Sequence, residues 1–241
     1  MCASSDPALS DPAPHGRPLR LAVLASGNGS NLGAILDACR AGQIRAEVVV
    51  VISDRPAARA LERARAAGVP AIAVPPQTDE SRDSHGERLL AALAPHAVDL
   101  VVLAGYMRIL SAGFVDSLRG RLINIHPSLL PRHKGLHTHR RVLEAGEPEH
   151  GCTVHYVTFD LDGGPAVLQS SVEVRADDDE ARLAARVLAR EHVIFPRVIG
   201  WIAEGRLTCP DGQPMLDGHP LDAPLQDRSP DPPTDPEPHP A

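Results

Sequence analysis

The sequence predicts a doubly wound α/β domain, in which helices cover both faces of a mostly parallel sheet. Two observations support this prediction. Apolar runs such as EVVVVIS at 47–53 and VDLVVLAG at 98–105 are continuous rather than alternating, as expected of strands that are buried on both faces. Each run is followed by a stretch with helical spacing, and strands that alternate with helices along the chain form parallel sheets.

The first part of the chain supplies the expected parallel strands in order. The apolar run LRLAVLA at 19–25 stops at the turn SGNGSN, and the next residues predict a helix that ends at Gly42, because glycine is common just after a helix. The remaining elements are strands at 47–53, 71–74, 98–105 and 122–126, and helices at 57–67, 81–93 and 112–118.

The pattern changes in the last third of the chain. Two apolar segments follow one another with only the turn-rich loop TFDLDGGP between them. This spacing favours antiparallel strands at the C-terminal part of the sheet. The expected elements are strands at 151–157 and 166–174, a long helix over about 178–202 and a small hairpin within 205–218.

Length and composition favour a single domain and argue against a nucleic-acid or membrane partner. A chain of 241 residues can bury one large core. The net charge of −7 and the absence of a basic run argue against a nucleic-acid partner. No apolar stretch is long enough for a membrane span, the N-terminus lacks signal-peptide features, and the four cysteines are scattered. We therefore expect a cytoplasmic protein with reduced thiols.

The two ends of the chain differ from the middle. Residues 1–18 and 223–241 are rich in proline, aspartate and serine, and such segments bury too little apolar surface to offset the entropy lost on ordering. We expect both to be disordered tails that flank a single folded domain at 19–222. Removing residues 1–17 and 225–241 should then leave activity intact.

The turn SGNGSN, residues 26–31, is the first candidate site. Gly27 and Gly29 let backbone N–H groups approach a ligand, and the start of the following helix favours an anion such as phosphate. The dinucleotide-binding pattern is not met because Gly33 falls one residue late, and the Gly-Lys-Ser/Thr of a nucleotide P-loop is absent. The alternative is a tight turn in which Asn and Ser cap a helix.

The strand LINIH ends in the second candidate site. Asn124 and His126 are two residues apart in a strand and therefore point to the same face, and Pro127 follows at once. This site and the glycine turn both lie at the carboxyl ends of parallel strands, where open α/β sheets bind ligands. Asp162, in the glycine-rich loop LDGGP, can bring a carboxylate to the same edge.

These three residue types suit acyl transfer. An Asn amide can stabilise a developing oxyanion, His can carry charge or a proton, and Asp can orient and charge the His. The alternative is that Asn124 and His126 cap a strand end and Asp162 is an ordinary turn residue. HKGLHTH at 133–139 lacks the cysteine or HExxH spacing of zinc sites, and no GxSxG elbow is present. We therefore expect neither a metal nor serine-hydrolase chemistry.

Several motifs resemble, in order, those of the phosphoribosylglycinamide formyltransferase family, folate-dependent enzymes of purine biosynthesis. The resemblance covers about residues 19–220. NIHPSLLP alone marks the wider group that uses 10-formyltetrahydrofolate, whereas the SGNGSN turn and the lack of an additional domain narrow it to this family. The motifs are SGNGSNL (26–32), LAGYMRIL (103–110), INIHPSLLP (123–131), GLHTH (135–139), EHGCTVHYV (149–157), LDGGP (161–165) and EH…P (191–196).

The resemblance implies formyl transfer from 10-formyltetrahydrofolate, as co-substrate, to the amine of glycinamide ribonucleotide, without a metal. It implies that Asn124, His126 and Asp162 are catalytic. The implied nucleotide-binding residues are Gly29, Ser30, Asn31, Leu32, Leu188, Ala189, Arg190 and Glu191. The implied folate-binding residues are Arg82, Met107, Arg108, Ile109, Leu110, Asn124, Thr158, Phe159, Asp160, Leu161 and Asp162.

Two other functions stay open at this point. The nearer one is hydrolysis of 10-formyltetrahydrofolate, in which water replaces the amine and the same three residues act. The more remote one is a nucleotide-binding regulatory module, in which the glycine turn binds phosphate and Asp54 meets a ribose hydroxyl. All three functions involve small molecules rather than nucleic acid or a membrane, and they leave open whether the protein is a monomer or a homodimer.

Overall fold

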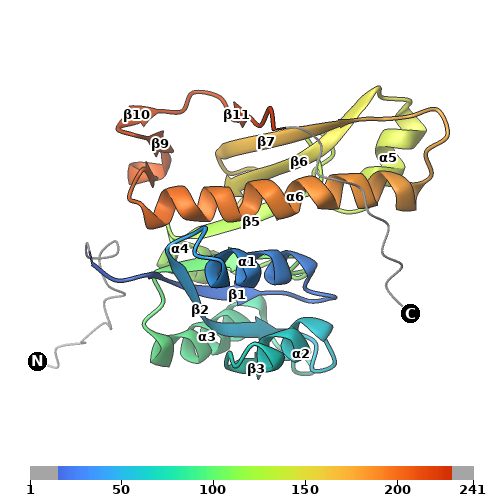
Figure 1. Ribbon diagram of the computed structural model, residues 1–241. Coiled ribbons are helices and arrows are strands. Elements are labelled where there is room, and N and C mark those ends of the chain that lie inside the picture. Colours follow the sequence, from blue (N-terminus) through green and yellow to red (C-terminus); the bar gives the residue numbers. More distant parts are fainter. Residues whose placement is uncertain (1–15, 230–241) are drawn as a thin grey trace, which may run out of the picture.

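The computed structural model describes residues 16–229 and shows a central sheet with helices on both faces (Figure 1). The main sheet has eight strands in the order β11-β7-β6-β5-β4-β1-β2-β3, and β10, β9 and β8 form a separate small sheet. Neighbouring strands from β3 to β5 are parallel, which confirms the doubly wound class. The strands are β1 (Leu19–Leu24), β2 (Ala46–Ser53), β3 (Ala71–Ala73), β4 (Leu100–Leu103), β5 (Leu122–His126), β6 (Glu149–Tyr156), β7 (Ala166–Glu173), β8 (Leu207–Thr208), β9 (Met215–Leu216), β10 (His219–Pro220) and β11 (Leu225–Gln226).

The C-terminal part of the sheet contains the expected change of direction. β6 runs antiparallel to both neighbours, so β7 returns to the direction of β5, and β11 pairs with β7 in parallel. The small sheet is antiparallel, as expected of the hairpin within 205–218.

The helices agree with the sequence pattern except for one addition. α5, which follows the HKGL turn, was not among the expected helices. Within residues 16–229, no helix combines the length and the apolar character that a membrane span requires. The α-helices are α1 (Ser30–Arg40), α2 (Arg59–Ala66), α3 (Arg82–Leu93), α4 (Ala112–Ser117), α5 (Thr138–Ala145) and α6 (Glu180–Ala203), and short 3-10 turns lie at Ala94–His96 and Pro210–Gly212.

Alternation of side chains along each strand divides the core into two layers. In β1, Leu21 and Val23 belong to the layer that contains α1, α2 and α6. Ala22 and Leu24 point the other way, into the layer with α3 and α4. Because both faces of β1 are covered, every one of these side chains is buried, which explains why the strand is apolar throughout.

The ends of the folded region extend beyond the expected boundaries. Arg17 Nη2 donates to Asp99 Oδ1 at 2.8 Å, so residues before 19 already contact the domain. Residues 223–229 were expected to be tail, but β11 pairs with β7 there. Composition did not reveal this pairing because its partners are distant in sequence. The remaining parts of both expected tails, 1–15 and 230–241, lie outside the described residues.

Candidate active site

The site lies where the order of the strands reverses at β1. β2 and β3 follow on one side of β1 and β4 and β5 lie on the other, which leaves a crevice outside the carboxyl ends of β1 and β4. The loops after these two strands are joined by two hydrogen bonds. Ser26 N donates to Gly105 O at 3.0 Å, and Ser26 Oγ accepts from Met107 N at 2.8 Å. The glycine turn and the GYMRIL segment therefore form one rim.

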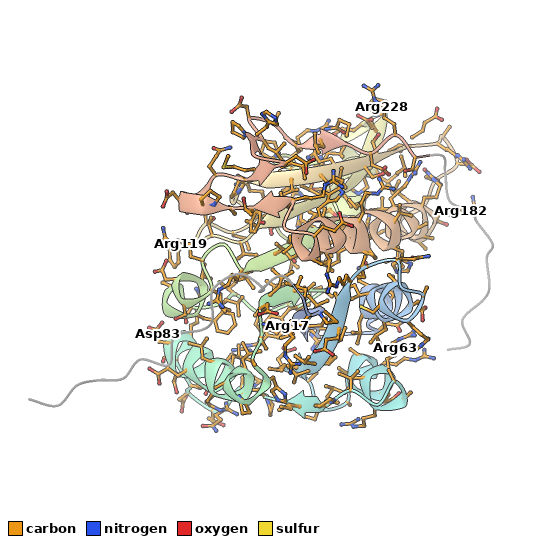
Figure 2. All side chains as sticks on the ribbon, turned by 60° about the vertical axis from the view of Figure 1, so that its left-hand side comes forward. Arg17, Arg63, Asp83, Arg119, Arg182 and Arg228 are labelled. Carbon is orange, nitrogen blue, oxygen red and sulfur yellow. The ribbon has the colours of Figure 1, made fainter. Side chains whose placement is uncertain are left out.

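The glycine turn presents the N-terminus of α1 to this crevice. Gly29, with φ of +74°, is the residue that precedes the helix and has no side chain to cap it. A Cβ at this position would lie 2.8 Å from the Cα of Ala60, so both the positive φ and the close approach of α2 require glycine. Arg63, labelled in Figure 2 between α1 and α2, donates to the carbonyl and to the side-chain oxygen of Asn28, both at 2.9 Å. This arrangement suits an anion.

Asn31 and Glu191 meet beside the glycine turn. Asn31 Nδ2 donates to Glu191 Oε2 at 2.7 Å, and each residue is only 7% exposed. α1 and α6, which carry these residues, pack side by side (Figure 1). Burial raises the pKa of Glu191 to about 7, although the Asn31 amide opposes the shift. A carboxyl group in this position, next to an anion site, suits the hydroxyl groups of a ribose.

His126 and Asp162 come together at the end of β5. His126 Nδ1 lies 3.5 Å from Asp162 Oδ2, and both side chains are about nine-tenths buried. His126 Nε2 lies 3.1 Å from the carbonyl oxygen of His133, so this nitrogen is the donor. Asp162 has a left-handed backbone with φ of +47°, and its Oδ2 accepts from Gly135 N at 2.8 Å. Both ring nitrogens of His126 therefore face oxygen atoms, and these contacts fix the orientation of the ring at the end of β5.

The side chain of Asn124 is oriented by His155, a residue that sequence reasoning missed. The two residues are register partners on the antiparallel strands β5 and β6. His155 Nδ1 lies 2.9 Å from the Tyr156 carbonyl and must donate to it, so Nε2 is left to accept from Asn124 Nδ2 at 3.1 Å. Burial lowers the pKa of His155 to about 4, so the ring is neutral near pH 7. One N–H of the Asn124 amide is thus occupied, and the other can serve a ligand.

A pocket beside Asn124 is formed mainly by residues that the resemblance assigned to folate. It lies between the segment after β4 and the loop between β6 and β7. Several apolar side chains of these segments are more than half exposed, namely Met107, Ile109, Phe159 and Leu161. The lining residues are Leu103, Tyr106, Arg108, Ile109, Leu110, Val115, Asn124, His155, Val157, Thr158, Phe159, Asp160, Leu161 and Asp162.

Some expected residues lie away from these contacts. Arg82 is exposed at the start of α3, and it and Met107 are not part of the pocket lining. Arg190 donates from Nη1 to the Ser229 carbonyl at 2.9 Å, so its side chain is directed to the C-terminal segment. In the HKGLHTH stretch, His139 pairs with His150 at 3.0 Å. Among residues 16–229, no group of three or more His, Cys, Asp or Glu side chains is placed to hold a metal ion.

Comparisons with known proteins found similar sequences and structures. The family model described as formyl transferase matches residues 19–199. Escherichia coli phosphoribosylglycinamide formyltransferase is 49% identical over 203 residues, which are 84% of this chain and 96% of that protein. The structure of phosphoribosylglycinamide formyltransferase from Coxiella burnetii has a TM-score of 0.82 at 44% identity and covers 87% of this chain and 100% of that chain. A formyltetrahydrofolate deformylase from Pseudomonas putida is more distant, with a TM-score of 0.76 at 28% identity, over 85% of this chain and 71% of that chain.

Proposed function

The chain belongs to the formyl transferase family, and on this premise we propose that it transfers the formyl group of 10-formyltetrahydrofolate to the amine of glycinamide ribonucleotide. The products are formylglycinamide ribonucleotide and tetrahydrofolate, in purine biosynthesis. The names of its relatives support this reaction. The observation that carries it is the contact between Asn31 and Glu191 at 2.7 Å, because transfer needs a nucleotide site beside the formyl group and hydrolysis does not.

The reaction needs an oxyanion donor and an exchange of protons. The amine nitrogen attacks the formyl carbon, a new C–N bond forms, and the carbonyl oxygen becomes negative. Collapse of this intermediate breaks the bond to N10 of the folate, the amine loses one proton, and N10 gains one. His155 accepts one N–H of Asn124, and the second N–H donates to the oxyanion. Such a donor commonly contributes about 10²–10³-fold in rate.

His126 acts in this mechanism through its charge. Its Nδ1 faces the Asp162 carboxylate at 3.5 Å, and in this proposal the ring carries a proton on each nitrogen and pairs with Asp162. The positive ring then stabilises the oxyanion at a distance. This role differs from a relay of protons through Nε2, because that nitrogen already donates to the His133 carbonyl.

The positions of the residues support the binding roles that we propose. The phosphate of the nucleotide lies at Gly29, Ser30 and Asn31, and the ribose lies at Glu191. The folate lies in the pocket lined by the segments after β4 and β6. We place the reaction in the cytoplasm, and the partners of the site are these two small molecules, with no nucleic acid or membrane.

The competing function is hydrolysis of 10-formyltetrahydrofolate. It uses the same Asn124, His126 and Asp162, so these residues do not discriminate between the two reactions. The nucleotide site does discriminate, because a hydrolase has no use for the glycine turn or for Glu191. The deformylase neighbour is also less similar, at 28% identity, than the transferase from Coxiella burnetii, at 44%.

The test is an assay of the purified protein with both substrates. We expect tetrahydrofolate to form only when glycinamide ribonucleotide is present, and formate release at the same rate without the nucleotide would favour the hydrolase. Asn124→Ala should lower kcat by about 10²-fold with folding intact. Asp162→Asn should lower kcat far more than it weakens nucleotide binding. Asp116→Asn, an exposed residue paired with Arg119, is the matched control and should keep wild-type kcat.

A further inference from the structure

The segment after β4 forms one wall of the folate pocket, and Tyr106 is the aromatic residue of this wall. Tyr106 lines the pocket together with Leu110 and Asn124. Its ring also packs against the core layer that contains α3 and α4. Tyr106 therefore separates the pocket from the core, and the orientation of its ring helps to set the shape of the pocket.

The main chain and the ring of Tyr106 are held by different partners. Ser26 bonds to the backbone of Gly105 and of Met107, the residues on either side of Tyr106. These two bonds fix the main chain but do not fix the rotation of the ring about its side-chain bonds. The Tyr106 hydroxyl lies 3.1 Å from His85 Nε2. Burial raises the pKa of Tyr106, so the hydroxyl keeps its proton and can donate to this nitrogen.

His85 is in turn held by Glu80. His85 Nδ1 lies 3.2 Å from Glu80 Oε2, and the two side chains are only 5% and 3% exposed. Glu80 also accepts from Arg88 Nη1 and from Gln77 N, both at 2.9 Å. The hydrogen bond from Arg88 lowers the pKa of Glu80 to about 2, so this group is a carboxylate near neutral pH. Because a carboxylate only accepts, His85 Nδ1 carries a hydrogen, and in the neutral ring Nε2 accepts from Tyr106.

Helix α3 gives His85 a fixed support. Asp83, labelled in Figure 2, is exposed, whereas His85, two residues later, lies on the opposite, buried face of the helix. The next residue, Gly86, packs so closely on Ser111 that a Cβ at this position would overlap the serine hydroxyl. Ser111 directly follows Leu110 of the pocket wall. α3 therefore meets this wall at two points, one through the side chain of His85 and one through the backbone of Gly86.

A buried polar chain of this kind is costly, because each of its groups must leave water and find a partner. An apolar side chain at position 85 would fill the layer without this cost. Such a network instead favours one geometry, since its groups are satisfied only in that arrangement. The contacts of Glu80, His85 and Tyr106 therefore point to a need for one orientation of the Tyr106 ring.

We infer that Glu80 and His85 are positioning residues for the folate, because they hold the ring of Tyr106 in the pocket wall before the folate binds. This inference rests on the proposed function. Neither Glu80 nor His85 is among the described lining residues of the pocket, so both act through Tyr106. A wall that is ordered in advance strengthens binding, because less entropy is lost when the ligand enters.

Calorimetric titration with tetrahydrofolate, the folate product of both transfer and hydrolysis, tests the inference in a double-mutant cycle. Tyr106→Phe removes only the hydroxyl, and His85→Leu removes its acceptor. Each change should raise the Kd about fivefold, as expected for the loss of one hydrogen bond. The double variant should bind no more weakly than the weaker single variant, because both changes remove the same contact. The matched control is His219→Leu, which alters an exposed histidine of β10 and should keep the wild-type Kd.

Two additional measurements separate a positioning role from general stabilisation. The KM for glycinamide ribonucleotide should change less than about twofold in Tyr106→Phe and in His85→Leu, because other elements form the nucleotide site. His85→Gln keeps an acceptor for the Tyr106 hydroxyl and should bind tetrahydrofolate more tightly than His85→Leu.

Three results would overturn the inference: an unchanged Kd in Tyr106→Phe, additive losses in the double variant, or an equal rise in the nucleotide KM. Tyr106→Phe changes a single hydroxyl, so it keeps the test open if His85→Leu folds poorly. Binding of tetrahydrofolate by a wild type that transfers no formyl group would instead overturn the proposed function, and the titrations would still test the role of His85.

Discussion

Replacing Glu191 with Gln should make the protein more stable at alkaline pH while it weakens nucleotide binding. Gln retains an oxygen that can accept from Asn31 Nδ2, which lies 2.7 Å from the wild-type carboxyl, but Gln does not ionise. Burial raises the pKa of Glu191 from 4.5 to about 7. Above that pH the wild-type chain must hold a desolvated negative charge at this position.

The size of the effect follows from this difference in pKa. Between pH 4.5 and 7 the folded chain keeps a proton on Glu191 that the unfolded chain has released, so stability falls as the pH rises. One pKa unit corresponds to about 1.4 kcal/mol, and the rise from 4.5 to about 7 therefore costs about 3 kcal/mol. Below pH 4.5 the carboxyl is protonated in both states and this cost disappears.

Urea unfolding at pH 4.5 and at pH 8 measures this contribution. Glu191→Gln should match the wild type at the lower pH and exceed its unfolding free energy by about 3 kcal/mol at the higher pH. The control is Glu204→Gln, which alters a half-exposed side chain at the C-terminal end of the same helix and should show no such pH dependence. A difference between Glu191→Gln and wild type that is the same at both pH values would refute the reasoning. The KM for glycinamide ribonucleotide should rise about tenfold, because a ribose hydroxyl loses its charged acceptor.

Three other contacts of the molecule lead to predictions. His155→Phe removes the acceptor that orients Asn124 and should lower kcat about tenfold with little change in the folate KM. The control is His219→Phe, at an exposed position. An unchanged kcat for His155→Phe would contradict the prediction. Arg63→Met removes two hydrogen bonds to Asn28 and should raise the nucleotide KM about fivefold. Arg65→Met, which alters an exposed arginine, should leave the nucleotide KM unchanged. An equal rise in the folate KM of Arg63→Met would argue against a local role for Arg63. Burial lowers the pKa of His150 to about 3, so the unfolded chain binds more protons below its ordinary pKa of 6.5 and stability should fall as the pH drops from 7 to 5. His150→Gln should reduce this fall in urea unfolding, and an identical fall would show that another group is responsible.

Local patterns predicted the frame of the molecule because each depends on only a few neighbouring residues. Burial on both faces makes a parallel strand apolar throughout, which identified β1, β2 and β4. The glycine turn was recognisable because Gly29 needs a positive φ and closely approaches Ala60. Helix α5 was missed because it is only eight residues long, has few apolar residues, and follows a stretch of histidines and turn residues.

Some features of the site depend on contacts that no local pattern contains. His155 became a partner of Asn124 only through the antiparallel pairing of β5 with β6, and a shift of one residue in register would turn it to the other face. Residues 225–229 have the composition of a tail, yet Asp227 meets arginines on α6. These contacts were missed because composition reports how much apolar surface a segment can bury and says nothing about a specific buried ion pair.

The sequence by itself determined the doubly wound class, the glycine turn and the Asn–His pair at a strand end, since strand periodicity and glycine geometry act over a few residues. Only the tertiary structure decided that Asn31 meets Glu191 across 160 residues, that His155 holds the Asn124 amide, and that Asp227 lies beside Arg190. The physical reason is that hydrogen bonds and ion pairs depend on distances between atoms in space, and chain topology sets those distances.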